Sequence, residues 1–296
     1  MKLFVFGLGY SALHFVRQNK HFIPSGTVRS RDAAADLRLE GIEAFAFDGA
    51  RGEAGLAEAL GQADLLLVSA PPSAAGDPVL NVYEPEILAS PGLKRVLYLS
   101  TVGVYGGADG AWVDERAPVR AASPRGKWRI DAEARWLALG VKRKTPVDVL
   151  RLAGIYGPGR SALDKLRDGT ARRIVKPGQV FNRVHVDDIA GVLARLIEAD
   201  GPGGVWNVAD REPAPPQDVI TFAADLLGVP PPPEEFYETA ELSPMARSFY
   251  ADNRRVSTER LARELGYVWR YPSYREALRE MAGADSLLPL AGEGGA

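Results

Sequence analysis

The sequence predicts an α/β protein in which a doubly wound domain around a parallel sheet is followed by a smaller, partly interleaved C-terminal lobe. In the first half of the 296-residue chain, short apolar runs alternate with segments of helical periodicity. This alternation is typical of a parallel sheet covered by helices on both faces. After Tyr156 the alternation is broken by Gly157-Pro158-Gly159, and later helical segments mix with proline-rich links such as Val229–Pro233.

Each expected strand is an apolar run that ends at a turn residue or a proline, and each expected helix follows such a turn. In chain order the expected strands are Leu3–Phe6, Phe22–Arg29, Ala44–Phe47, Leu65–Ser69, Arg95–Ser100 and Val147–Leu152. The expected helices are Ser11–Gln18, Ala33–Leu39, Leu56–Leu60, Asp188–Glu198, Pro216–Leu227 and Thr258–Leu265.

The same patterns divide the chain. We expect residues 1–156 to form the sheet domain, with 181–209 returning to it, and residues 157–180 and 210–283 to form the second lobe. The end of the chain, 284–296, lacks periodicity and is expected to be disordered.

Composition excludes several classes of protein. The chain is 46% hydrophobic and 25% charged, as expected of a soluble globular protein. A net charge of −2 gives no sign of a nucleic-acid or membrane partner. The absence of cysteine excludes disulfides and thiolate chemistry, and the three scattered histidines form no metal-ligand pattern. No apolar run is long enough for a membrane span, and Leu3–Phe6 is too short for a signal peptide, so a cytoplasmic location is expected.

A glycine motif follows the first strand. Gly7-Leu8-Gly9-Tyr10-Ser11-Ala12 fits G-x-G-x-x-A between a strand and a helix, which is the context of a dinucleotide-binding Rossmann turn. Gly7 permits the tight turn, Gly9 lets a pyrophosphate approach the backbone, and Ala12 allows close helix–strand packing. An ordinary strand–helix turn is the competing interpretation.

The end of the second strand favours NADP over NAD. An acidic residue there would bind the adenosine ribose, but the chain has Arg29 and Ser30, which suit a 2′-phosphate. Arg31 could equally be a solvated loop residue. Asp48, which closes the third strand, could accept a hydrogen bond from adenine or cap the next turn. Ser69, at the end of the fourth strand, is also expected to bind the cofactor.

Four further segments resemble the extended short-chain dehydrogenases/reductases of the NAD(P)-dependent epimerase/dehydratase family. The similarity runs in order over nearly the whole chain. It is carried by Leu99–Gly106, Arg151–Gly159, Arg183–Ala190 and Trp206–Asp210. The resemblance implies a sheet for the dinucleotide, a C-terminal lobe for a small-molecule substrate, and a Ser/Thr, Tyr and Lys constellation.

Only part of that constellation is present. Thr101 matches the Ser/Thr, where it could hold a substrate oxygen or simply bond backbone at the strand end. If Glu133 is the glutamate of the family pattern, Arg129 stands at the lysine and Arg125 at the tyrosine. A guanidinium is permanently protonated and cannot exchange a proton, although Arg129 could still bond the nicotinamide ribose. Lys127 lies about 200° around the helix from Arg129 and cannot replace it. The chain therefore resembles the atypical branch of the family.

Three other residues could supply the missing proton. They are Tyr105 and Tyr156, in loops at strand ends, and His185, whose ordinary pKa is suitable. Packing explains the tyrosines equally well, and a position before the Asp187/Asp188 helix start explains His185. An anionic substrate or solvent would account for the later arginines Arg183, Arg254 and Arg255.

Together these features predict an NADP-dependent oxidoreductase acting on a small polar or nucleotide-linked carbonyl or alcohol, with Thr101, Tyr105 and Arg129 as candidate catalytic residues. The alternative is a non-catalytic NADP-binding sensor or partner-binding protein, since fold resemblance alone does not separate the two.

Overall fold

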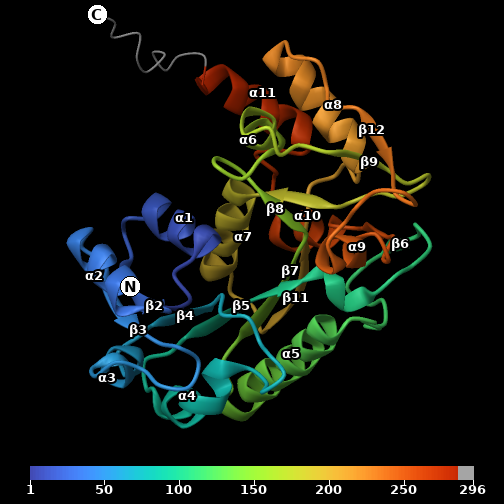
Figure 1. Cartoon of the computed structure of the whole chain (residues 1–296). Coiled ribbons are helices and arrows are strands. Elements are labelled where there is room, and N and C mark those ends of the chain that lie inside the picture. Colours follow the sequence, from blue (N-terminus) through green and yellow to red (C-terminus); the bar gives the residue numbers. More distant parts are fainter. Residues whose placement is uncertain (286–296) are drawn as a thin grey trace, which may run out of the picture.

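The structure, a computed structural model, describes residues 1–285 and has the predicted α/β architecture (Figure 1). Its central sheet has seven strands in the order β11-β7-β5-β4-β1-β2-β3, and all neighbouring strands are parallel. The strands are β1 Lys2–Phe6, β2 Ile23–Val28, β3 Glu43–Ala46, β4 Leu65–Val68, β5 Arg95–Thr101, β7 Val147–Leu152 and β11 Gly203–Val208.

Helices cover both faces of this sheet, because alternate strand residues point to opposite sides. In β1, Leu3 and Val5 face one core and Phe4 and Phe6 face the other. The first face is covered by α1 Tyr10–Gln18, α2 Arg31–Leu39, α7 Val186–Glu198 and α10 Glu259–Leu265. The second face is covered by α3 Leu56–Gly61, α4 Pro78–Ala89 and α5 Pro124–Arg143.

The remaining elements gather mainly in the C-terminal part, in the upper half of Figure 1. Parallel two-stranded pairs form between β8 Gly154–Tyr156 and β10 Arg183–His185, β9 Arg173–Val175 and β12 Glu234–Phe236, and β6 Trp112–Val113 and β13 Arg255–Val256. The helices are α6 Ala162–Arg167, α8 Pro216–Leu227, α9 Pro244–Phe249 and α11 Tyr274–Asp285, and the 3₁₀ turn η1 spans Val102–Tyr105. Within residues 1–285, no helix is long and apolar enough to cross a bilayer.

The structure confirms the predicted fold class and adds helices that the sequence patterns did not indicate, among them α4, α6, α9 and α11. Helix α4 carries Pro78 at its start and Pro85 inside it, and such prolines normally argue against a helix. It forms because Asp77 caps it, accepting hydrogen bonds from the N–H groups of Val79 and Leu80 at 2.9 and 3.0 Å.

The predicted division into lobes has one clear structural counterpart. Strand β11 lies in segment 181–209 and joins the edge of the sheet beside β7. The lobe boundaries themselves stay a prediction. Of the expected disordered tail, residues 284 and 285 end α11, and 286–296 lie outside the described residues.

Candidate functional site

The glycine turn leaves an open surface at the start of α1. Gly7 has a φ of +91°, and a Cβ on it would lie 3.0 Å from the Ala70 backbone nitrogen, so only glycine fits without strain. A Cβ on Gly9 would meet nothing within 4 Å, and no side chain caps the helix that Gly9 begins. Ala12 is fully buried against the sheet. Gly9 is exposed and no side chain caps α1, so the start of this helix is open to an anion such as a pyrophosphate.

Ser69 adjoins this turn. Its N–H and that of Ala70 both donate to the Phe6 carbonyl, at 2.8 and 3.0 Å, which brings the end of β4 beside Gly7. The Ser69 side chain is half-buried, and within residues 1–285 its hydroxyl makes no hydrogen bond. It is therefore available to a group bound above the turn.

The end of β2 is electropositive and unpaired. Arg29 and Arg31 are exposed, and within the described part of the chain neither guanidinium makes a hydrogen bond or ion pair. Between them, the Ser30 hydroxyl accepts from the Ala33 N–H at 3.3 Å and caps α2. The two arginines are therefore available to bind an anion, whereas Ser30 also stabilises the start of α2.

Asp48 has a local structural role. One carboxylate oxygen accepts from the N–H groups of Arg51 and Ala50, at 2.7 and 2.8 Å. These backbone hydrogen bonds lower the pKa of the carboxyl. The geometry therefore matches the turn-capping alternative, and adenine recognition by Asp48 stays a prediction.

The Thr101 hydroxyl bonds backbone at the end of its strand, which was the alternative to binding a substrate oxygen. Its Oγ1 accepts from the Gly103 N–H at 3.1 Å and caps η1. The residue is half-buried at the carboxyl end of β5. Because the hydroxyl accepts in this bond, its own proton is still available to an acceptor outside the protein.

Tyr105 belongs to a buried polar network. It is 3% exposed, donates to Asn207 Oδ1 at 2.7 Å and accepts from Arg151 Nη1 at 2.9 Å. Arg151 pairs with Glu133 at 2.8 Å, and Glu133 also accepts from the Ser100 hydroxyl. Burial raises the pKa of Tyr105.

This network gives Tyr105 a packing role and leaves it no exposed proton to exchange. The sequence did not indicate the network, because its members come from β5, η1, α5, β7 and β11 and share no spacing. The one local signal of a buried polar group was Glu133, a charged residue that is buried together with Ala132 and Trp136 of the same helix.

Helix α5 orients the two residues that were predicted to stand at the tyrosine and lysine positions of the family pattern. Arg129 Nη1 donates to the Leu99 carbonyl at 2.7 Å and to Tyr98 Oη at 3.1 Å, so this side chain faces the end of β5. Arg125, one turn earlier, is exposed and makes no hydrogen bond within residues 1–285, and Lys127 is also exposed. Contact of Arg129 with a ribose stays a prediction.

The other two candidate proton donors are buried. His185 is 2% exposed, and its Nδ1 accepts from the Asp187 N–H at 3.2 Å at the start of α7. Burial lowers the pKa of His185 to about 4. The ring packs edge-on against Tyr156, which is 8% exposed and whose pKa burial raises. Both residues therefore match their structural alternatives.

The later arginines are neither free cations nor solvated side chains. Arg183 donates to the carbonyls of Phe181 and Ala214, at 2.9 and 3.1 Å, and burial lowers its pKa. Arg254 pairs with Asp252 at 3.2 Å and bonds the Gly106 carbonyl, and Arg255 bonds the Gly110 carbonyl. The sequence interpretations, an anionic substrate or solvent as the partner, were both incomplete. They did not include arginines that donate hydrogen bonds to the backbone carbonyls of loops.

Several known proteins are similar to this chain in sequence and fold. No protein-family model matches the chain. A solved structure, described as a functionally unknown conserved protein from Silicibacter pomeroyi DSS, is 44% identical, with a TM-score of 0.86 over 96% of this chain and 98% of that one. A putative NAD-dependent epimerase/dehydratase from Methylobacillus flagellatus is 25% identical, with a TM-score of 0.68 over 96% and 98%. Protein YeeZ of Escherichia coli strain K12 is 27% identical over 273 residues, 84% of this chain and 87% of that protein.

Two further similarities concern proteins with named activities. A dTDP-glucose 4,6-dehydratase from Bacillus anthracis, solved in complex with NAD, is 18% identical with a TM-score of 0.75 over 97% of this chain and 96% of that one, and shows the fold alone. A 3-diazoavenalumate denitrifying reductase from Streptomyces is 29% identical over 182 residues. That match covers 56% of this chain and 58% of the reductase.

Proposed function

We propose that this chain, which belongs to the extended short-chain dehydrogenase/reductase, NAD-dependent epimerase/dehydratase family, is a cytoplasmic NADP-dependent oxidoreductase. Its substrate is a small polar or nucleotide-linked carbonyl or alcohol, and it works without the Tyr-Lys pair. The observation that carries the proposal is the open surface beside Gly9, at the uncapped start of α1. In a Rossmann fold this is the place where the pyrophosphate of a dinucleotide binds.

The chain's own residues fit a dinucleotide. The N–H groups of the first turn of α1 would bind the pyrophosphate, and the Ser69 hydroxyl adjoins the same space. When bound, the cofactor supplies hydride chemistry. The protein would orient the substrate over the carboxyl end of β5, where Thr101 can donate its hydroxyl proton to a substrate oxygen.

The preference for NADP rests on Arg29. Its guanidinium has no partner within residues 1–285, and no acid ends β2 to bond a ribose hydroxyl. A dTDP-glucose 4,6-dehydratase of the same fold was solved in complex with NAD, so the proposed preference for NADP rests on the residues of this chain alone. A hydrogen bond to a charged group supports a preference of about ten- to a hundredfold.

Calorimetric titration with NADPH and NADH tests this proposal. We expect NADPH to bind more tightly by that factor, and Arg29→Ala to remove most of the difference while leaving NADH affinity unchanged. Arg17→Ala, another exposed arginine, which pairs with Glu40, serves as the matched control and should leave both affinities intact. Equal affinities in the parent protein would remove the assignment to NADP.

A second candidate function, a non-catalytic NADP-binding sensor, is favoured by one observation. Arg125 stands at the tyrosine position, and Tyr105, Tyr156 and His185 are all buried. Single-turnover oxidation of bound NADPH with a panel of aldehydes, ketones and nucleotide sugars separates the two. Oxidation that depends on the carbonyl compound supports the enzyme, whereas tight binding with no oxidation by any member of the panel supports the sensor.

A further inference from the structure

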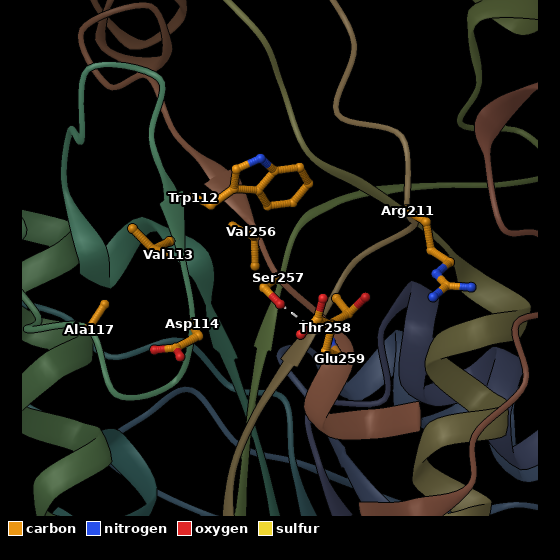
Figure 2. A pocket seen from close by; sticks show the side chains of 9 residues that line it. All are labelled: Trp112, Val113, Asp114, Ala117, Arg211, Val256, Ser257, Thr258 and Glu259. Carbon is orange, nitrogen blue, oxygen red and sulfur yellow. Dashed lines mark hydrogen bonds between the residues drawn. The ribbon is translucent and has the colours of Figure 1, made fainter. Parts of the chain in front are cut away.

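A separate pocket lies beside β11, the edge strand of the sheet, with β7, β5 and β4 between it and β1 (Figure 2). Its volume is about 570 Å³, within the usual range for small-molecule sites. Three stretches of chain form its walls: the loop that contains β6, the residue after Asp210, and β13 with the start of α10. The lining residues are Trp112, Val113, Asp114, Ala117, Arg211, Val256, Ser257, Thr258 and Glu259.

The framework of this pocket is fixed by hydrogen bonds. Strands β6 and β13 pair along one wall, and the Ser257 N–H donates to the Val113 carbonyl at 2.9 Å. The Ser257 carbonyl accepts from Asn207 Nδ2 at 3.1 Å, and the Asn207 N–H donates to Glu115 Oε1 at 2.9 Å. Asn207 Oδ1 also accepts the hydrogen bond from the Tyr105 hydroxyl. The pocket is therefore built on the same buried network as the end of β5.

Several groups that line the pocket have no protein partner. Within residues 1–285, the Arg211 guanidinium makes no hydrogen bond or ion pair and lies over the Trp269 ring at 5.4 Å. The Glu259 carboxylate is likewise unpaired in the described residues. Thr258 is 6% exposed, and its hydroxyl also has no partner there. The Trp112 ring is 59% exposed, which is unusual for a large aromatic side chain.

The charges are divided between opposite walls. Figure 2 shows Arg211 on one side of the pocket, Asp114 on the other, and Glu259 below and between them. Asp114 is ion-paired with Arg116 at 2.6 Å, whereas the Glu259 carboxylate has no ion-pair partner within residues 1–285. A ligand of a single charge would be attracted by one wall and repelled by the other. A zwitterion suits both, and the exposed Trp112 ring offers a face to an apolar side chain of such a ligand.

We propose that this pocket binds a free α-amino acid with an apolar side chain. Arg211 binds the carboxylate, Glu259 with Asp114 binds the ammonium group, and Trp112 with Val256 contacts the side chain. The Thr258 hydroxyl donates to the ligand carboxylate or accepts from its ammonium group. The proposal concerns a second site and does not depend on the identity of the dinucleotide or of the substrate.

Calorimetry on the full chain with three probes tests the proposed ligand class. The probes are L-phenylalanine, 3-phenylpropionate, which lacks the ammonium group, and 2-phenylethylamine, which lacks the carboxylate. We expect saturable binding of L-phenylalanine and binding of each single-charge probe about ten- to a hundredfold weaker, the range that one charged hydrogen bond supports. Equal binding of all three probes, or no saturable binding of L-phenylalanine at millimolar concentration, would overturn the proposal.

Substitutions locate the binding in this pocket. Arg211→Gln and Glu259→Gln should each weaken L-phenylalanine binding about tenfold or more, and Arg211→Gln should abolish the advantage of L-phenylalanine over 2-phenylethylamine. Arg263→Gln, an exposed arginine in α10 that pairs with Glu264, is the matched control and should bind like the parent. Because Arg211 and Glu259 are exposed, the variants should keep the parent melting temperature. Folded variants with unchanged binding would place the ligand elsewhere and refute the assignment.

Discussion

The glycine turn between β1 and α1 and the polar cluster at the end of β5 lie at the carboxyl ends of two strands that are separated by β4, yet they differ in how their polar groups are used. At the turn, the start of α1 is open and uncapped, and Arg29 nearby has no partner within residues 1–285. At the end of β5, Tyr105 and Arg129 are hydrogen-bonded inside the protein and Thr101 accepts from backbone. The first region is organised to meet a ligand, whereas the second is organised largely to hold itself together.

This contrast shows what a sequence motif can and cannot establish. A motif specifies where a residue stands, but the partners around it determine whether its polar atoms are available. Tyr105 and Gly9 both belong to recognisable family segments, and only Gly9 opens onto unfilled space.

Breaking the buried network should cost the most stability. Glu133→Ala leaves the Arg151 guanidinium buried without its anion, which typically costs about 3–5 kcal/mol of unfolding free energy. Glu40→Ala breaks an exposed pair with Arg17 and should cost about 1 kcal/mol or less. Urea denaturation monitored by circular dichroism measures both.

A further variant distinguishes the charge from the packing in this network. Replacing both partners, Glu133→Leu with Arg151→Met, should recover part of the loss, because no unpaired charge is then buried. If Glu133→Ala cost no more than Glu40→Ala, the end of β5 would not be the self-contained cluster described above.

At the glycine turn the expected effect is on binding and not on stability. Gly9→Val places a side chain in the open space, where a Cβ meets no protein atom within 4 Å. The fold should therefore persist, with a change of about 1 kcal/mol or less from the altered helix N-cap. NADPH affinity should fall by about a hundredfold or more, since the side chain occupies the pyrophosphate position. Retained affinity in a folded variant would mean that this turn binds no dinucleotide.

His185, which is buried at the start of α7, allows burial of a polar side chain to be tested through the pH dependence of stability. The unfolded chain exposes an imidazole of ordinary pKa near 6.5, and burial lowers the pKa to about 4 in the folded protein. Between these values only the unfolded state binds the proton, so the unfolding free energy should fall as the pH drops. The contribution from His185 at pH 5 is about 2 kcal/mol.

The measurement is the difference in unfolding free energy between pH 7 and pH 5. His185→Gln should reduce this difference by about 2 kcal/mol, whereas His21→Gln, at an exposed position, should leave it unchanged. An equal pH dependence in the parent and in His185→Gln would show that the imidazole is not held neutral by burial.

The sequence predicted the fold well because strands and helices leave periodic traces. Helix α8 was predicted with its observed bounds, and β1, β5 and β7 to within a residue. Helix α4 was missed, since its two prolines hide the pattern and its stability comes from the Asp77 cap and from packing against α3 and α5. Such tertiary compensation leaves no local signal.

The site was predictable where one local segment forms it, as at Gly7, Gly9 and Ala12. It was not predictable where distant segments meet. Asn207 forms hydrogen bonds with both Tyr105 and Ser257, which are 102 and 50 residues away from it in the sequence. The spacing of these three residues does not indicate that they meet. The partners of Arg129 on β5 were hidden for the same reason.

The smallest effects are expected for Arg125 and Arg129 of α5. They compare a side chain without hydrogen bonds in the described residues with one that is hydrogen-bonded, within the same helix. Arg125 is exposed without a partner in the described residues, so Arg125→Ala should change stability by no more than about 0.5 kcal/mol. Arg129→Ala removes hydrogen bonds to Leu99 O and Tyr98 Oη and should cost about 1–3 kcal/mol. If Arg129 also contacts the ribose, NADPH affinity should fall in that variant and not in Arg125→Ala.

Restoring the family pair, Arg125→Tyr with Arg129→Lys, then asks what the second region has lost. The tyrosine would carry an exchangeable proton at a position where the parent has only a permanent cation. NADPH oxidation that appears with carbonyl compounds in this double variant, and not in Arg125→Phe with Arg129→Lys, would show that the site kept its geometry and lost its acid. A folded, NADPH-binding double variant without oxidation would mean that the end of β5 is arranged for structure alone, and would favour the sensor.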